Sequence, residues 1–460
     1  MRFNSRRGNS RGVVFILLFF ILLAMGGFYL YNSTLFEKTP PVVEIKKQII
    51  SNLKRPIFVS VKDNIGLKKV RILLTDGQRI LGKETREFPI GTKEKIIKIN
   101  FPAFRITPHN KKLLLVIEAT DTSKWNYFKG NKTLTKTKIT VDKQKPELYP
   151  ILSSYGITKG GSAVVIFKAK DDNIKNIYIT TNFDKKFIPT PFYKNGYYIS
   201  LLAWPVREKR FSASLVAIDK AGNKSRYNLD LFRKNKNYRV SKIKLKESFI
   251  NGKITDLAEE ISKETASLPP SERFRYINET LRKENEKKIE EATLPTDKEM
   301  IKDFKISVFY PLKNAAAVAS FGDHRFYFYK EKQISTSYHL GLDLASTAGA
   351  DIISSNDAKV VFSEYNGIYG NNLILRHSLG LYSLYGHCSV INISKEDEVK
   401  KGDIVAQTGK SGLALGDHLH FGILIQGIEV RPDEWIDKRW IKTNIDDIIE
   451  KAKKIIDKRE

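Results

Sequence analysis

His339-Leu340-Gly341-Leu342-Asp343 and His418-Leu419-His420 are the two ends of the stretch that decides how the C-terminal part of this chain folds. In an extended strand, alternate side chains leave the same face, so His418 and His420 share one face and Leu419 takes the other. His339 and Asp343 also stand an even number of residues apart, and Gly341 leaves room for a metal or a substrate backbone. We expect both ends to meet at one site.

The donor types at these two ends are those that zinc prefers. Neutral imidazole nitrogens and carboxylate oxygens are normal zinc ligands, and three protein ligands plus one water form a catalytic site. The chain has seven histidines, and five of them fall in this window, where His377 and His387 are the other two. The pattern predicts a Zn²⁺ site. His377 is the exception, because a lone histidine on a half-apolar strand is more often a packed residue with hydrogen-bonded ring nitrogens.

Residues from about Phe309 to Asp437 resemble the lysostaphin-type, or LytM-type, zinc metallopeptidases, which cut the peptide bridges of peptidoglycan. The resemblance rests on Ser320-Phe321-Gly322 with Arg325, His339-x-x-x-Asp343, Tyr385-Gly386-His387, Gly402-Asp403 and His418-Leu419-His420-Phe421. It implies that the metal ligands are His339, Asp343 and His420. It also implies that His387 and His418 polarise the attacking water and stabilise the oxyanion.

The chain departs from this resemblance at two positions. Gly422 stands where many members carry an acidic residue, which puts one hydrogen-bond partner of the ligands in doubt, since metal-bound histidines normally donate their other N–H to a carboxylate or carbonyl. Cys388 stands where an aliphatic residue is usual. Because adjacent strand residues face opposite ways, we expect Cys388 to be a buried filler and not a nucleophile paired with His387.

The resemblance leaves three functions to compare. The first is a zinc endopeptidase that hydrolyses an amide in a peptidoglycan stem or cross-bridge. The chain has no His-Glu-x-x-His helix to supply a glutamate base, so His387 and His418 are the candidates for that role. The second is a non-catalytic activator of another wall hydrolase, and the complete residue set favours catalysis over it. The third is proteolysis of proteins, because a metal site does not name its peptide.

Short apolar runs between Gly-rich turns predict an antiparallel sheet over residues 306–440, with the metal at one end. We expect loops at residues 325–336 and 413–417 to wall a groove. Residues 441–460 are expected to form a C-terminal helix that packs on the domain through Ile448, Ile449, Ala452 and Ile456. Residues 241–305 have helical apolar spacing with a break at Pro269-Pro270, and this helical connector could pack on the domain, cover its groove or contact a partner.

Two β modules are predicted upstream, at residues 39–143 and 144–240. Short alternating strands are separated by Gly, Asn and Asp turns, as in β-sandwiches. A weak repeat relates Val116–Asp121 to Leu215–Asn223, and the Ala-x-Asp-Lys-Ala-Gly-Asn ending resembles bacterial immunoglobulin-like domains. The modules hold no converging histidines or carboxylates, so we expect a spacer or docking role, with spacer preferred.

Residues 1–38 predict a cytoplasmic tail and a transmembrane anchor. The run from Gly12 to Tyr31 has no charge and is long enough to cross a bilayer as a helix. Arg2, Arg6, Arg7 and Arg11 precede it, so the positive-inside rule sends the body outward. We predict a single-pass protein of the inner membrane with a periplasmic body; a cleaved signal peptide near Ala24-Met25-Gly26 is the alternative.

The composition sets further limits. A chain of 460 residues needs several domains, and its net charge of +28 attracts polyanions. Peptidoglycan and the membrane are the expected partners, with protein partners in the envelope left open; nucleic acid is not expected, because no recognition motif accompanies the charge. Cys388 is the only cysteine, so no disulfide can form within the chain. The predicted fold class is multidomain and mainly β.

Overall fold

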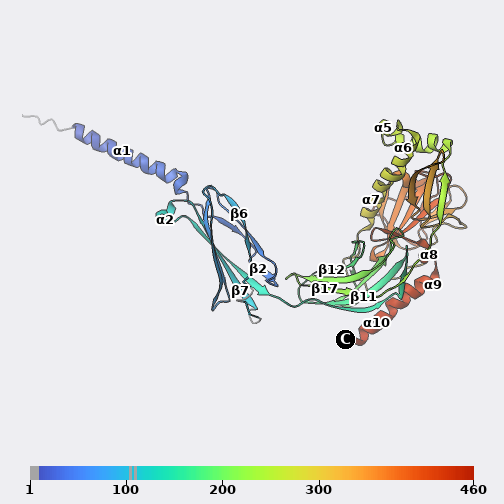
Figure 1. The fold of residues 1–460 in the computed structure, drawn as a ribbon, viewed down its shortest axis with the longest axis horizontal. Coiled ribbons are helices and arrows are strands. Elements are labelled where there is room, and N and C mark those ends of the chain that lie inside the picture. The colour runs from blue at the N-terminus through green and yellow to red at the C-terminus, as the bar shows by residue number, and fades with distance from the viewer. Residues whose placement is uncertain (1–9, 103–105, 108–110, 460) are drawn as a thin grey trace, which may run out of the picture. The chain divides into compact units, whose positions relative to one another are not determined.

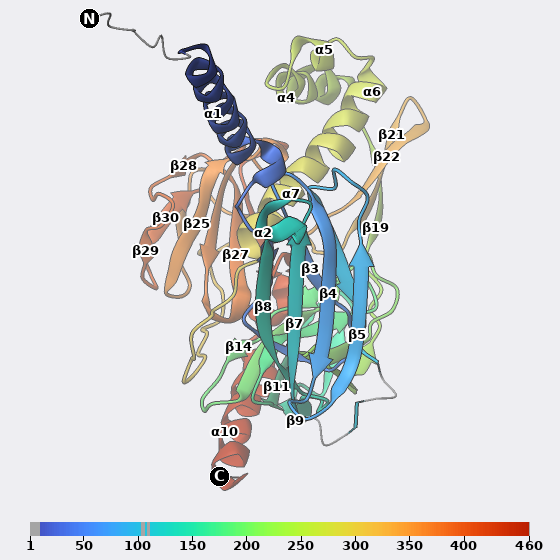
Figure 2. The ribbon, with the colours of Figure 1, turned by 90° about the vertical axis from the view of Figure 1, so that its left-hand side faces the viewer.

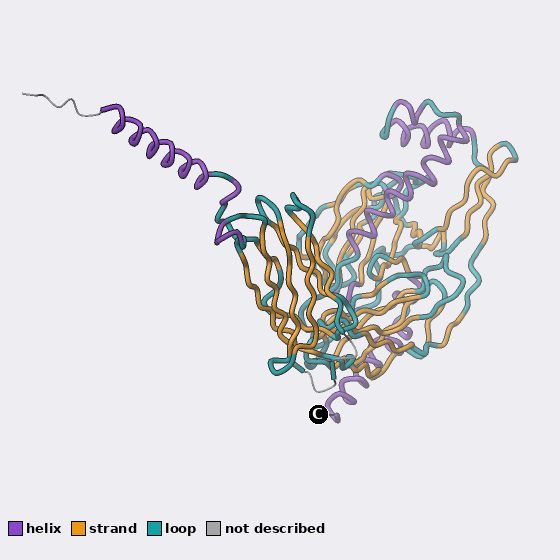
Figure 3. The backbone as a smooth tube through the Cα atoms, turned by 60° about the vertical axis from the view of Figure 1, so that its left-hand side comes forward, coloured by secondary structure: helices purple, strands orange, loops and turns teal. Residues whose placement is uncertain are grey.

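The computed structural model describes residues 10–102, 106–107 and 111–459, and the chain is mainly β, as predicted (Figures 1 and 3). It divides into two compact units, residues 1–145 with 219–223, and residues 146–218 with 224–460. The predicted boundaries between the β modules, connector and metallopeptidase domain stay predictions, because the second unit contains most of these parts together.

The N-terminal helix α1 spans Ser10–Asn32. Its segment Gly12–Asn32 is long and apolar enough to cross a membrane, a test that a signal sequence near the N-terminus also passes. The apolar side chains are exposed all round the helix; Phe15 and Phe28, for example, are each 73% exposed. Such a helix needs an apolar environment outside the chain. Arg2, Arg6 and Arg7, which supported the predicted orientation, lie outside the described residues.

The first β module packs two sheets around one core. Alternation buries one face of each strand, as the pattern of β3 shows, where Ile57, Val59 and Val61 are inside. One sheet has the order β1-β3-β6, and the other has the order β2-β8-β7-β4-β5; Figure 2 shows β8, β7, β4 and β5 side by side. The strands are β1 Val42–Glu44, β2 Gln48–Ser51, β3 Ile57–Lys62, β4 Leu67–Thr75, β5 Ile80–Glu87, β6 Glu94–Ile99, β7 Lys112–Asp121 and β8 Lys132–Val141, with a short helix α2 at Trp125–Phe128.

The second β module has two four-stranded sheets, β14-β15-β11-β9 and β13-β12-β16-β17, and a parallel pair β10-β18. Its strands are β9 Glu147–Ser153, β10 Gly156–Thr158, β11 Ser162–Lys170, β12 Ile174–Thr181, β13 Lys186–Phe187, β14 Thr190–Pro191, β15 Tyr197–Ala203, β16 Ala213–Asp219, β17 Lys224–Asn228 and β18 Phe232–Lys234. Strand β11 is buried on both faces, because one sheet face meets the opposite sheet and the other meets the C-terminal helix.

The predicted helical connector begins with a strand. Residues Val240–Lys244 form β19, which pairs in parallel with β21 in a sheet of order β19-β21-β22. A backbone pairing with a strand about 80 residues further on leaves no mark in local helical spacing. The helical segments follow at α3 Glu247–Phe249, Ile250–Ile254, α4 Thr255–Glu259, α5 Lys263–Ala266, α6 Pro270–Arg275, Tyr276–Leu281 and α7 Arg282–Thr293. The break at Pro269-Pro270 is where predicted, since α6 starts at Pro270.

The C-terminal domain is built on an eight-stranded sheet of order β20-β23-β31-β27-β26-β25-β29, with β32 beside β31. These strands are β20 Ala316–Ala319, β23 Leu342–Ala345, β25 Ala358–Tyr365, β26 Asn371–Arg376, β27 Leu381–Cys388, β29 Glu398–Val399, β31 Leu419–Ile425 and β32 Ile428–Val430. Strands β24 Asp351–Ile353, β28 Val390–Ile391 and β30 Ile404–Gln407 make a small second sheet. The predicted antiparallel sheet is confirmed.

Residues 325–336, predicted as a loop, instead belong to the hairpin β21 His324–Tyr329 and β22 Lys332–Tyr338. The chain ends in α8 Pro432–Trp435, α9 Lys438–Ile441, Lys442–Asp446 and α10 Asp447–Arg459. Ile449, Ala452 and Ile456 of α10 are buried as predicted, and α10 packs against β9 and β11 of the second β module. Figure 1 shows α10 along β11.

Candidate metal centre

Two neighbouring strands of the main sheet place the central pair of this site. Asp343 on β23 lies directly opposite His420 on β31 in an antiparallel register. Opposed residues of such a pair have Cβ atoms only about 5 Å apart, so their side chains meet. His339 lies just before β23 and not on it, so its approach depends on the turn that precedes the strand and not on strand alternation. Leu419 points into the core, as the alternation predicted.

The donor atoms of His339, Asp343 and His420 form a small triangle. His339 Nε2 lies 2.9 Å from Asp343 Oδ1 and 3.2 Å from His420 Nδ1, and His420 Nδ1 lies 2.8 Å from the same Oδ1. Tetrahedral zinc with bonds of about 2.1 Å sets its ligand atoms about 3.4 Å apart. All three side chains are buried. The triangle therefore fits one Zn²⁺ in donor type, size and burial.

Backbone contacts fix the orientation of His339 and His420. The Nδ1–H of His339 donates to the Ser320 carbonyl at 2.9 Å, which leaves Nε2 directed at Asp343. The His420 ring fills the space beside Gly341, where an added Cβ would lie 2.5 Å from His420 Nε2. Gly341 thus makes room for a ligand ring, and not for a metal or substrate backbone as its position suggested.

The pKa shifts of Asp343 and His420 support their assignment as candidate metal ligands. Burial would raise the pKa of Asp343, but the adjacent His339 and His420 rings hold that pKa well below its usual value. Burial lowers the pKa of His420 to about 4, against the opposing hydrogen bond and charge of Asp343. A charged carboxylate beside a neutral imidazole is the protonation state that a divalent metal needs.

His387 and His418 lie beside the triangle as a second pair, with ring centroids 4.8 Å apart. Their Nδ1–H groups donate to the carbonyls of Ser411 and Gly416, each at 2.8 Å, so their Nε2 atoms keep lone pairs. His418 Nε2 lies 3.8 Å from Asp343 Oδ1. Burial, together with the neighbouring His420 and His418 rings, lowers the pKa of His387 to about 3. The pair places two imidazole rings beside the donor triangle.

His387 adopts a backbone conformation that is unusual for its residue type, with a φ of +64°. A non-glycine residue in this region costs about 1–3 kcal/mol and persists where the surroundings hold it, as at functional sites. Cys388 next to it is buried, and burial raises the pKa of its thiol to about 12. The predicted role of Cys388 as a filler is confirmed.

His377 is a structural residue, as predicted. Its Nδ1 bonds the Asp357 carbonyl at 3.1 Å, and its Nε2 bonds Ser383 Oγ at 2.9 Å. Its ring packs on Phe309, with centroids 5.2 Å apart. Both ring nitrogens are therefore used, and none is directed at the metal centre.

The site lines a groove of about 750 Å³. The predicted wall at residues 413–417 is present, and the hairpin β21–β22 contributes Arg325 and Tyr327. Sequence reasoning missed the opposite wall, which comes from β19 and from the connector residues Phe249, Phe274 and Arg282. Of the three roles left open for the connector, packing on the domain is what the structure shows.

Sequence reasoning also missed the polar contacts around Arg325. Its Nε donates to Asp323 Oδ2 at 3.3 Å, and its guanidinium lies 4.0 Å from Asp343 Oδ2. Asp323 is buried and also accepts a hydrogen bond from Ser241 of β19 at 2.8 Å. The Asp323-x-Arg325 spacing at the start of β21 was the available signal, but the serine partner comes from a distant segment. This network holds a positive charge beside the carboxylate ligand.

Comparison with known proteins places a family match on this site. Residues 337–432 match Peptidase family M23. The chain is 34% identical over 94 residues to the DD-carboxypeptidase/endopeptidase Mpg of Neisseria meningitidis and 34% identical over 88 residues to the peptidoglycan DD-endopeptidase ShyB of Vibrio cholerae. It is 33% identical over 101 residues to the murein hydrolase activator NlpD of Escherichia coli.

These matches cover limited parts of the proteins. The alignment takes in 20% of this chain and 22% of Mpg, 19% and 21% for ShyB, and 22% and 26% for NlpD. Thus the chain spans about a fifth to a quarter of the length of these relatives. Among solved structures, a putative peptidase M23 from Pseudomonas aeruginosa is similar over 62% of this chain and 96% of its own, at 18% identity and a TM-score of 0.35.

Proposed function

We propose that this chain, which carries a Peptidase family M23 domain at residues 337–432, is a membrane-anchored zinc metalloendopeptidase that hydrolyses peptide bonds in peptidoglycan stems or cross-bridges. The observation that carries the proposal is the triangle of donor atoms from His339, Asp343 and His420, together with the two histidine rings beside it. The relatives named as DD-endopeptidases support the substrate class.

Three side chains would hold the metal, and two would handle the proton. A zinc ion held by His339, Asp343 and His420 would lower the pKa of a bound water to about 7 and polarise the scissile carbonyl. Of His418 and His387, whose Nδ1–H groups are held by backbone carbonyls, one accepts the proton of the attacking water at Nε2 and returns it to the leaving amine, and the other donates a hydrogen bond to the negative charge that develops on the carbonyl oxygen. No covalent intermediate with the protein is needed.

The remaining parts of the chain would place this site at the wall. We infer that α1 is a single-pass anchor in the inner membrane and that the body lies in the periplasm, where peptidoglycan is accessible. The charge of +28 favours association with an anionic polymer or membrane surface. Two immunoglobulin-like modules would lie between the anchor and the peptidase domain in sequence, and envelope proteins remain candidate partners.

A non-catalytic activator is the second candidate, and the similarity to NlpD favours it. An activator would use the groove beside the site to bind another hydrolase without cutting its ligand. The five residues His339, Asp343, His387, His418 and His420 argue for catalysis, because a binding surface does not require two further imidazole rings beside three metal donors.

Muropeptide analysis tests the proposal. The purified full chain, loaded with zinc, is incubated with sacculi, and the released fragments are identified by mass spectrometry with and without a chelator. We expect zinc-dependent release of fragments cut at a peptide bond. If the zinc-loaded chain leaves sacculi intact but stimulates a separate wall hydrolase, the activator function replaces the endopeptidase function.

A further inference from the structure

One turn of the chain holds His339 by three hydrogen bonds. The Ser320 carbonyl accepts from His339 Nδ1 at 2.9 Å, the Gly322 amide donates to the His339 carbonyl at 2.7 Å, and the His339 amide donates to the Asp323 carbonyl at 2.9 Å. His339 lies outside the regular strands, so this turn takes the place of a sheet register. Whatever fixes the turn therefore fixes the position of the imidazole.

A small apolar cluster lies against this turn. Phe321 and Leu340, which flank the hydrogen-bonded residues, are buried together with Val206 of the second β module. Tyr238 and Tyr338 pack on the same cluster, and the rings of Tyr238 and Phe321 meet edge to face with centroids 5.9 Å apart. The second β module thus supplies part of the core beneath a metal ligand.

Tyr238 is wedged between two turns. An added Cβ at Gly322 would lie 2.2 Å from Tyr238 Cδ1, and one at Gly160 would lie 2.3 Å from the Tyr238 hydroxyl. Both glycines have positive φ, +83° and +77°. The hydroxyl donates to the Lys159 carbonyl. The ring therefore connects the Lys159–Gly160 turn of the second β module with the turn that holds His339.

The second β module cannot move freely against the M23 domain, because polar contacts also join them. The Arg431 amide donates to the Gly160 carbonyl at 2.7 Å, and the Ser162 amide donates to Glu434 Oε2 at 2.8 Å. Trp435 Nε1 donates to Ser162 Oγ at 3.1 Å. The turn on which Tyr238 rests is thus attached to the end of the sheet that carries the site.

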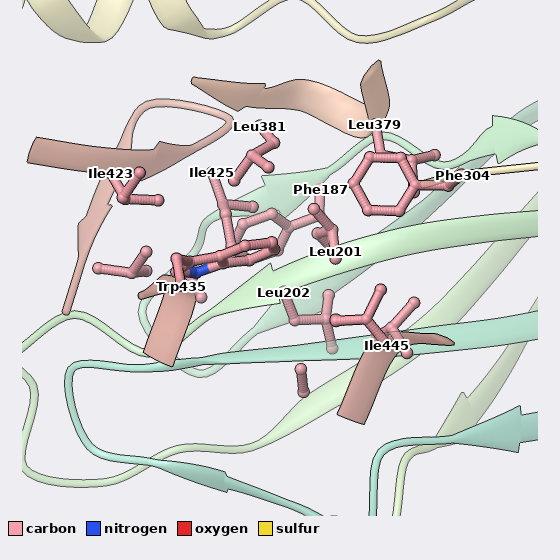
Figure 4. Close-up of a cluster of buried hydrophobic side chains, with 14 of the residues drawn as sticks. Phe187, Leu201, Leu202, Phe304, Leu379, Leu381, Ile423, Ile425, Trp435 and Ile445 are labelled. Carbon is pink, nitrogen blue, oxygen red and sulfur yellow. The ribbon is translucent and has the colours of Figure 1, made fainter. Parts of the chain in front are cut away.

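The hydrophobic core also continues without a break between these parts. Figure 4 shows side chains of the second β module among those of the M23 domain and the C-terminal helical segments: Phe187, Leu201 and Leu202 lie beside Leu379, Leu381, Ile423, Ile425, Trp435 and Ile445. Cores packed to crystal-like density transmit displacements instead of absorbing them. A displacement of core side chains in the second β module therefore also displaces side chains of the main sheet.

We propose that Tyr238 and Val206 are positioning residues for His339, so that the second β module is a working part of the metal centre and not a spacer. The proposal rests on the proposed function, since it concerns zinc binding by His339. Loss of the Tyr238 ring frees the Phe321–Gly322 turn, and the imidazole then loses the orientation that aims Nε2 at Asp343. Residues that orient a metal ligand commonly affect metal affinity by about 10–100-fold.

The test compares two tyrosines of the same region in the full chain. Tyr238→Ala removes the wedge, and Tyr198→Ala removes a half-buried ring that stacks on Phe167, 5.6 Å between centroids, away from the turn. Zinc affinity is measured by competition with a chelator, and amide exchange of residues 320–340 is measured in the metal-free chain. We expect Tyr238→Ala to lose about tenfold or more in zinc affinity and to exchange faster. Tyr238→Phe, which keeps the ring, should restore most of both properties.

Different results would contradict the positioning role of Tyr238 and the proposed zinc-dependent function. Wild-type zinc affinity and wild-type exchange in Tyr238→Ala would overturn the positioning role, as would an equal loss in Tyr198→Ala. If Tyr238→Ala does not fold, Val206→Ala decides by the same two readouts, with a smaller expected loss. A wild-type chain that binds no zinc would overturn the proposed function instead, and the exchange of residues 320–340 would still decide whether Tyr238 holds the turn.

Discussion

The two groups of histidines in this site differ in where their nitrogens point. In the first group, His339 and His420 direct a nitrogen each at one oxygen of Asp343, and the three atoms lie 2.8 to 3.2 Å apart. In the second group, His387 and His418 are held by backbone carbonyls, and His418 Nε2 lies 3.8 Å from Asp343 Oδ1. The difference supports the proposal that the first group holds a cation and the second handles a proton.

The sharpest way to break this comparison is to remove a metal-holding ring. In His420→Ala, two donors remain, so we expect the chain to lose its zinc and its turnover together. The loss of zinc affinity should exceed the roughly 10–100-fold typical of removing a residue that only orients a ligand. Metal analysis after dialysis and digestion of sacculi are the measurements. Retention of one zinc per chain would show that His420 is not a ligand.

The complementary change removes a proton-handling ring. His418→Ala should keep most of its zinc affinity and lose about 10²–10⁴-fold in turnover, the usual contribution of general acid–base catalysis. His387→Asn is the matched variant, because asparagine tolerates the positive φ of that position. Normal digestion of sacculi by either variant would contradict the role of that residue.

A third change fills the space beside His420 without removing any of the three donor side chains. In Gly341→Ala, the new methyl group would meet the His420 ring at 2.5 Å, and the ring has to move. Overpacking of this kind costs about 1–3 kcal/mol, so we expect a roughly tenfold or larger loss of zinc affinity. Gly252→Ala is the control, because its Cβ would meet nothing within 4 Å and should leave the affinity unchanged. Equal zinc affinities in Gly341→Ala and Gly252→Ala would show that zinc binding does not depend on the space beside Gly341.

The smallest effect is expected from His377, which belongs to neither group. Burial lowers its pKa to about 4, so the folded chain disfavours its protonation. Its contribution to stability is present above the unfolded pKa near 6.5 and is lost as pH falls towards 4, at up to about 1.4 kcal/mol per pH unit. His377→Gln should flatten the fall of Tm between pH 6.5 and 4 in the metal-free chain and leave zinc affinity unchanged. A changed zinc affinity in His377→Gln would show that His377 influences the metal centre and is not only a packed residue.

Much of the site could be predicted from residue types and local spacing. The alternation of His418, Leu419 and His420 gives the shared face, and the donor chemistry of His339 and Asp343 gives the metal class. The partners that orient the rings could not be predicted, because they are backbone carbonyls of Ser320, Ser411 and Gly416, and any residue could supply a carbonyl. The doubt raised by Gly422 is therefore answered in part by main-chain acceptors.

The fold also has features that local sequence patterns predicted and features that they did not. Short apolar runs predicted the antiparallel sheet, and Pro269-Pro270 predicted a break in the helical connector, which lies between α5 and α6. Strand β19 was missed because its partner β21 is distant in sequence and the pairing uses backbone groups. The second β module was read as a spacer because it holds no chemistry of its own. Its contribution lies in packing residues such as Val206, which look like any other core residue in a sequence.

X-ray absorption at the zinc edge of the loaded full chain tests the central claim most directly. The account predicts one zinc with two imidazole nitrogens and carboxylate or water oxygens at about 2.0–2.2 Å, and a loss of imidazole scattering in His420→Ala. A sulfur neighbour from Cys388, or an unchanged spectrum in His420→Ala, would contradict it.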